Sequence, residues 1–166
     1  MHLRVTDDVD EFAGVADDFL RRDPFSANVV AVEVEGVRSG RRALRPGSVW
    51  VLVEEDGGPV GCAMHTPPHN VFLPRLGDGV PEAIADELRR VGRAFPGVSG
   101  EVATVRRFCR RWEELGGPGT VCRKSMRMYA LGTLRPPSGV PGRARRGLRA
   151  DTDLVVAWLR SFSAET

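Results

Sequence analysis

The chain has 166 residues, of which 42% are hydrophobic and 28% are charged, a composition typical of a globular domain and not of a disordered segment. Its three cysteines lack Cys-x-x-Cys spacing and no secretion signal is recognisable, which indicates reduced thiols in a cytoplasmic protein. No apolar run approaches the roughly 20 residues that cross a bilayer, so we expect no membrane association.

The charge is nearly balanced overall but unevenly distributed. The net charge is +2, yet residues 1–88 carry 8 basic and 16 acidic side chains, whereas residues 89–166 carry 16 basic and 6 acidic ones. Such asymmetry can mark a polyanion-binding half. It can also mean that one half of the fold neutralises the other, and we favour this second interpretation.

The first part of the chain predicts a strand and two helices. Residues 2–5 are typical of a short strand, and Thr6 is a suitable N-cap for a helix that extends to about Arg22. The pair Asp23-Pro24 opens a second segment, with proline at the first helical position. Its valines alternate as in a strand, but its apolar residues also fit one helical face, and we predict a helix.

The middle of the chain predicts a β-hairpin followed by alternating elements. Residues 49–54 and 60–66 are apolar runs joined by Asp56-Gly57-Gly58-Pro59, which is a strong hairpin signal. The elements predicted after it are a short strand over 71–73, a helix from 79 to Pro96-Gly97, a strand over 98–102, a helix that ends at Gly116-Gly117, and a long strand over 120–131.

The last part of the chain predicts a linker followed by a further strand and helix. Residues 132–147 are rich in Pro, Gly and Arg, which is typical of a linker. A strand fragment at Leu148-Arg149 and a helix over 151–165 follow. This helix must pack on its own domain, on a second copy or on another partner, because it carries several large apolar side chains, namely Leu154, Trp158, Leu159 and Phe162.

The order of predicted elements defines the expected fold class. It is an α/β (α+β) fold in which helices flank a mixed, mainly antiparallel sheet, with a C-terminal β-α extension. Two helices before a three-stranded meander resemble the GNAT-type N-acetyltransferase fold. Local runs resemble the degenerate amino-terminal half of two-domain bacterial GNAT proteins, and they are residues 6–9, 19–24, 55–61, 66–69, 127–129, 131–132, 134–137 and 140–142.

The resemblance implies a domain organisation and a function. Residues 1–131 would be a degenerate GNAT-like domain, 132–147 a linker, and 148–166 the start of a second, truncated GNAT-like domain. The family transfers an acetyl group from acetyl-CoA to an amine, and this chain would be the non-catalytic domain that supports that reaction. The alternatives are a protein-interaction or dimerisation module that uses the last helix, and a weak polyanion binder.

The GNAT resemblance implies a cofactor loop at residues 74–79. The family's pattern is [Gln/Arg]-x-x-Gly-x-[Gly/Ala], whose backbone N–H groups cradle the pyrophosphate of acetyl-CoA. Gly77 and Gly79 fit this pattern and Arg75 lies one place late. Pro74, however, removes a backbone donor, and Asp78 adds a negative charge where the phosphates would lie. We therefore predict an ordinary glycine-rich loop.

No complete catalytic set is recognisable. By its position in the resemblance, His69 would line a substrate groove. His65 and His69 are separated by Pro67-Pro68 and have no third partner, so we predict loop histidines and no metal site. Tyr129 falls on a predicted strand, where we expect a packing role.

Two arginine clusters, at residues 106–111 and 143–149, could contact phosphate groups, but the second has no interleaved aromatic residues and the first comes from an arginine-rich sequence. We therefore expect solvated charge there and no nucleic-acid partner.

Overall fold

The computed structural model describes residues 1–139 and 141–165. Two compact units divide the chain, Met1–Arg123 and Lys124–Thr166. Val140, which begins the last run of the GNAT resemblance, and the final Thr166 lie outside the described residues. No helix in the described part of the chain is both long enough and apolar enough to cross a membrane.

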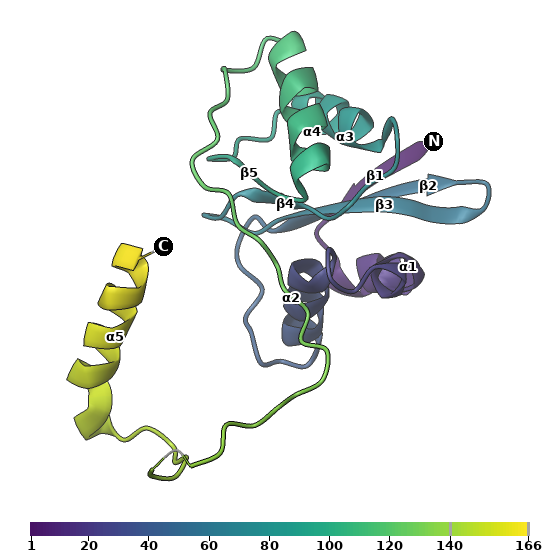
Figure 1. The fold of residues 1–166 in the computed structure, drawn as a ribbon. Coiled ribbons are helices and arrows are strands. Elements are labelled where there is room, and N and C mark those ends of the chain that lie inside the picture. Colours follow the sequence, from purple (N-terminus) through teal and green to yellow (C-terminus); the bar gives the residue numbers. More distant parts are fainter. Residues whose placement is uncertain (140, 166) are drawn as a thin grey trace. The chain divides into compact units, whose positions relative to one another are not determined.

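The first unit is built on one five-stranded sheet in the order β1-β2-β3-β4-β5. Neighbouring strands run antiparallel except for β4 and β5, which are parallel and are connected through a helix. The expected mixed, mainly antiparallel sheet flanked by helices is confirmed (Figure 1). The strands are β1 His2–Thr6, β2 Val49–Glu55, β3 Gly58–His65, β4 Val71–Leu73 and β5 Val98–Gly100.

Helices cover both faces of this sheet. In Figure 1, α1 and α2 lie on one side, and α3 and α4 lie on the other. Each helix packs an apolar face on the sheet, where full burial of one large apolar side chain contributes about 1.5–3 kcal/mol. The helices are α1 Val9–Arg22, α2 Asn28–Arg38, α3 Val80–Arg90 and α4 Val102–Glu114.

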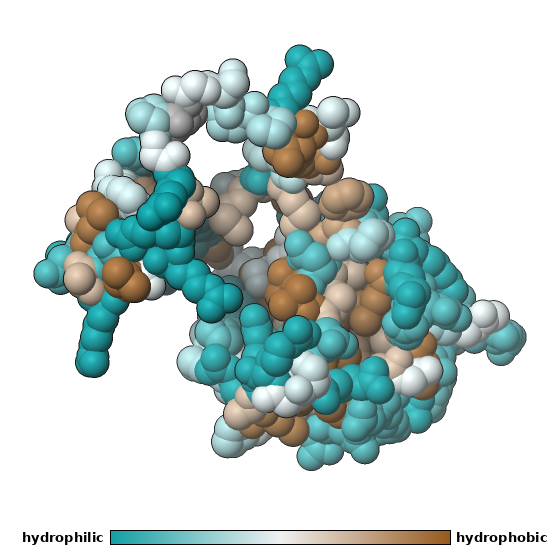
Figure 2. Space-filling view, turned by 90° about the horizontal axis from the view of Figure 1, so that it is seen from below, coloured by the Kyte–Doolittle hydropathy of each residue, from teal (hydrophilic) through white to brown (hydrophobic). Residues whose placement is uncertain are grey.

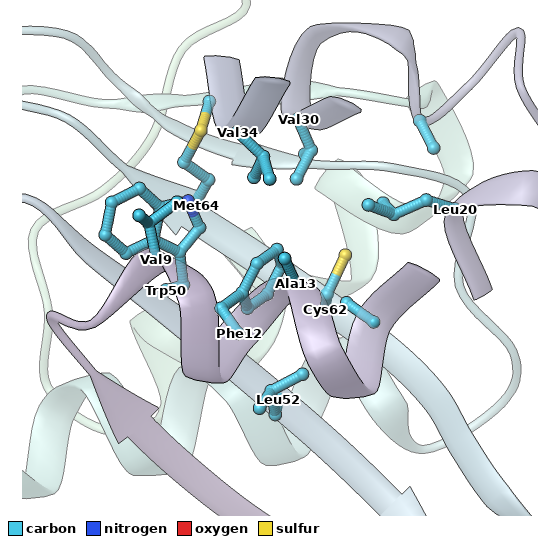
Figure 3. Packing of buried hydrophobic residues seen from close by; sticks show 12 residues of the cluster. Val9, Phe12, Ala13, Leu20, Val30, Val34, Trp50, Leu52, Cys62 and Met64 are labelled. Carbon is cyan, nitrogen blue, oxygen red and sulfur yellow. The ribbon is translucent and has the colours of Figure 1, made fainter. Parts of the chain in front are cut away.

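The core between α1, α2 and the sheet centres on two aromatic rings. Figure 3 shows Phe12 of α1 beside Trp50 of β2, and their ring centroids are 6.0 Å apart. Val30 and Val34 of α2 point into the same cluster.

The outward face of α2 carries exposed Val32. Figure 2, which views the molecule from the side of α1 and α2, shows apolar patches among hydrophilic groups. The second segment is therefore a helix, as predicted, with apolar residues on both faces.

The first two helices, α1 and α2, begin differently from the prediction. Asp8 is the N-cap of α1, because its side chain accepts hydrogen bonds from the backbone of Asp10 and Glu11. Thr6 instead ends β1. The second helix begins at Asn28 and not at Pro24, since the Asp23 carboxylate accepts from the Ser26 N–H at 3.1 Å and holds residues 24–26 in a turn.

The third helix ends earlier than its apolar pattern predicts. Gly92 has a φ of 65°, and its N–H donates to the Arg89 carbonyl. The Arg93 N–H then donates to the Leu88 carbonyl at 2.9 Å, which completes a Schellman motif and stops the helix at Arg90. Residues 91–96 are consequently a connection, not the last turns of the helix predicted to reach Pro96.

The predicted strand over residues 120–131 is wrong, because this segment has no regular structure and is exposed. A strand forms only where a partner receives its hydrogen bonds, whereas Thr120 donates both its N–H and its hydroxyl to Glu113. The strand fragment at Leu148-Arg149 is wrong too. Arg149–Asp151 forms a 3-10 turn that leads into α5 Thr152–Glu165, and Asp151 accepts from the Leu148 N–H at 2.7 Å.

Candidate functional site

The loop at which the GNAT resemblance would place the cofactor leaves β4 and enters α3. Gly79, its last residue, has a φ of 79°, a left-handed conformation that favours glycine. Beside the loop, β4 approaches β5 so closely that a Cβ atom at Gly100 would collide with the Leu73 carbonyl oxygen. Arg75, Gly77 and Gly79 thus lie on one short connection, as the sequence predicts, between a close strand pair and a helix N-terminus.

Neighbouring side chains already accept hydrogen bonds from this loop. The Arg75 N–H donates to the Ser26 hydroxyl at 2.8 Å, and the Arg75 guanidinium lies 3.3 Å from Asp23. The next backbone N–H, of Leu76, donates to the hydroxyl of the buried Thr104 at 3.2 Å. Ser26 lies between α1 and α2, and Thr104 lies in the first turn of α4. These two hydroxyls therefore occupy backbone donors that an anion would need.

The charges around the loop are paired with each other. Arg107 of α4 forms ion pairs with Asp78 in the loop and with Glu82 in the first turn of α3. Burial acts to raise the pKa of Glu101, but hydrogen bonds from Thr104 and Ala103 outweigh it and hold that pKa below its usual value. A carboxylate therefore caps α4 here, and two more carboxylates neutralise the arginine that could otherwise attract phosphate.

The two histidines predicted to be loop residues have different environments. His69 is exposed and ends a turn in which its N–H donates to the Thr66 carbonyl at 3.0 Å. It precedes β4, whereas the loop with Gly77 follows β4, so the strand lies between the substrate and cofactor positions that the resemblance implies. His65 is not a loop residue but the buried end of β3, and its ring packs edge-on against Phe95 at 6.2 Å.

A groove at the C-terminal end of α3 was not predicted from the sequence. It has a volume of about 610 Å³ and is lined by His65 and Arg93 together with Pro67, Pro68, Val91 and Pro96. The Arg93 Nε donates to Nδ1 of His65 at 3.0 Å, and its Nη2 donates to the Gly47 carbonyl. Gly92, inside the predicted helix, was the signal that could have revealed the early stop that places Arg93 here.

Other reactive groups do not assemble into a catalytic or metal site within the described part of the chain. No cluster of three or more His, Cys, Asp or Glu side chains suited to a metal ion is found there. Burial raises the pKa of the Cys62 thiol, so it stays protonated at neutral pH. Tyr129, for which a packing role was predicted, is 82% exposed, and that prediction is wrong.

The chain was compared with known proteins in three ways. No protein-family model matches it, and neither the curated proteins nor the solved structures contain a match.

Proposed function

We propose that this chain is a cytoplasmic, GNAT-type N-acetyltransferase-related protein with a non-catalytic role. In this proposal it supports a catalytic GNAT domain, which transfers an acetyl group from acetyl-CoA to an amine. The support for the family is the order of elements in the first unit, with two helices before the β2-β3-β4 meander and α3 directly after β4. The support for a non-catalytic role comes from the β4–α3 loop.

One observation carries the non-catalytic role. A loop that cradles a pyrophosphate presents its backbone N–H groups to the phosphate oxygens. Here the N–H groups of Arg75 and Leu76 donate to Ser26 and Thr104 instead. A phosphate would have to displace both hydroxyls and approach Asp78, whose carboxylate lies in the same loop. These contacts favour a loop that fixes the first unit and does not hold acetyl-CoA.

Calorimetric titration of the full chain with acetyl-CoA tests this role. We expect no saturable heat with the wild-type chain or with Gly77→Val, at a position where an added Cβ meets no atom within 4 Å, so the fold should stay intact. Saturable binding that Gly77→Val weakens would instead assign the cofactor to this loop, and the non-catalytic role would be wrong.

The alternative, an interaction module, is favoured by the surface of α5. Its large apolar side chains are exposed, with Trp158 and Phe162 each 64% accessible. Such a concentration of apolar groups is typical of an interface. If α5 mediates dimerisation, light scattering should show a concentration-dependent dimer that Trp158→Asp abolishes and the neighbouring Arg160→Gln preserves. A monomer at all concentrations would contradict dimerisation.

The third candidate, polyanion binding, has less support. Arg107 and Arg111 in the first basic cluster pair with carboxylates of α3, and Arg145 in the second pairs with Asp151. Paired arginines release few counterions from a polyanion, so binding would be weak. Retention on heparin at physiological salt, lost when Arg106 and Arg110 are replaced by Gln, would revive this candidate.

A further inference from the structure

The groove at the C-terminal end of α3 contains an arginine whose charge is not neutralised. Arg93 forms no ion pair within residues 1–139 and 141–165, and it donates hydrogen bonds to the neutral Nδ1 of His65 and to the Gly47 carbonyl. Its neighbour Arg90 differs, because Glu87 accepts from it at 2.6 and 2.7 Å. The guanidinium of Arg93 therefore retains both Nη1 hydrogens and one Nη2 hydrogen as donors.

The Arg93 guanidinium is held in place through both its backbone and its side chain. The Schellman motif holds the Arg93 backbone, since its N–H donates to the Leu88 carbonyl. Two residues later, Phe95 packs against Trp112 of α4 with ring centroids 4.8 Å apart. His65 then anchors the side chain by accepting from Nε, which requires the neutral ring to carry its proton on Nε2. The remaining donors are thus held in place before any ligand arrives.

Much of the wall of the groove is apolar. Pro67, Pro68, Val91 and Pro96 line it around the arginine. The groove is open to solvent, has a volume of about 610 Å³ and combines apolar walls with a few polar groups. The groove combines the Arg93 guanidinium with several apolar side chains. This combination fits a ligand with one anionic head group and an apolar body.

The charge of the head group is also constrained. A guanidinium binds a carboxylate through two parallel hydrogen bonds. A phosphate dianion would add charge close to the C-terminal end of α3, where the helix dipole is negative. One unpaired arginine next to a helix C-terminus therefore selects a singly charged head group.

We propose that this groove binds a small carboxylate with an apolar body, held by Arg93 and positioned by His65. The proposed acetyltransferase-related role assigns nothing to this site. The groove follows α3, whereas the β4–α3 loop precedes it, and an 11-residue helix separates the two by about 16 Å along its axis.

Titration of the full chain with benzoate, followed by NMR of the Arg93 side-chain N–H and the His65 ring, tests the proposal. We expect saturable shifts at both groups, with benzoate bound about tenfold more tightly than neutral benzamide, because the charge-assisted hydrogen bonds are lost with benzamide. Acetate, which lacks the apolar body, should also bind more weakly than benzoate.

Two variants make the test specific. Arg93→Gln should weaken benzoate binding about tenfold, whereas the matched control Arg90→Gln should leave it unchanged. Arg93→Lys keeps the charge without the planar fork and should give an intermediate affinity, which distinguishes loss of the head-group contact from loss of the fold. Circular dichroism of each variant checks that the protein is folded.

The proposal would be overturned if benzoate binding did not saturate, if benzamide bound as tightly as benzoate, or if the folded Arg93→Gln variant retained wild-type affinity. Inorganic phosphate binding more tightly than benzoate would also overturn it, since that outcome would identify a general anion site. None of these outcomes depends on acetyl-CoA, so this proposal and the proposed function fail independently.

Discussion

The two ends of α3 use arginine in opposite ways. At the N-terminal end, Arg75 and Arg107 are both paired with carboxylates, and the loop between β4 and α3 donates its hydrogen bonds to hydroxyl groups. At the C-terminal end, Arg93 is held by neutral acceptors and has no counter-ion in the described part of the chain. Pairing with carboxylates, and not the number of arginines, therefore distinguishes the two ends of the helix.

The largest expected effect comes from breaking the strand pair beneath the loop. Gly100→Ala places a Cβ against the Leu73 carbonyl oxygen at a φ of 143°. We expect the free energy of unfolding to fall by about 4 kcal/mol, since backbone atoms cannot move aside. Urea denaturation measures this loss. The control Gly77→Ala, whose Cβ meets nothing within 4 Å, should change stability by less than about 0.5 kcal/mol, and equal effects would contradict the close approach.

The second-largest effect tests the hydrogen bond between the Thr104 hydroxyl and the loop backbone. Thr104→Val keeps the shape of the side chain but removes the hydroxyl that accepts from the Leu76 N–H at 3.2 Å. Because the site is buried, the unpaired donor should cost about 1–3 kcal/mol of stability. Thermal unfolding measures the change, and Thr133→Val in an exposed segment is the control. No difference between the two variants would show that water replaces the hydroxyl.

A smaller effect is expected from the exposed pair at the start of the loop. Arg75→Gln removes the contact with Asp23 but keeps the backbone hydrogen bond to Ser26. Because the Arg75 side chain is 69% exposed, the loss should be within about 0.2–1 kcal/mol in chemical denaturation. A much larger loss would mean that this ion pair, and not the hydroxyl contacts, fixes the loop.

The smallest effect is visible only at acidic pH and tests the other end of α3. Burial, and then the charge of Arg93, lower the pKa of His65 below its ordinary value of 6.5, although a backbone interaction with His69 opposes the shift. The unfolded chain therefore binds the proton more readily than the folded chain. The stability that this group contributes is present above about pH 6.5 and is lost as the pH falls toward the lower folded pKa.

Denaturation of the wild type and of His65→Gln between pH 7.5 and 5.5 isolates this contribution, because the two proteins differ only at this residue. We expect the wild type to lose stability relative to the variant as the pH falls. Parallel curves would indicate that His65 is not buried against Arg93.

The amino-acid sequence by itself determined the local elements of the first unit. The Asp56-Gly57-Gly58-Pro59 turn predicts the β2-β3 hairpin, and the apolar periods predict α1, α3 and α4, because turn chemistry and helical periodicity depend on residues close in sequence. The Gly77 and Gly79 pattern likewise predicts a glycine-rich connection before a helix. What that connection binds stays a prediction, since no local pattern reveals which distant side chains reach it.

Only the tertiary structure decided which polar groups meet. The sequence places Thr104 and Leu76 far apart, and their hydrogen bond exists because α4 packs beside α3. His65 and Arg93 are separated by 28 positions and meet only because the chain turns at Gly92. The strand predicted over 120–131 did not form for the same reason, because a strand depends on a partner from elsewhere in the chain. Local propensity thus sets the elements, whereas long-range packing decides which charges are neutralised and which remain available.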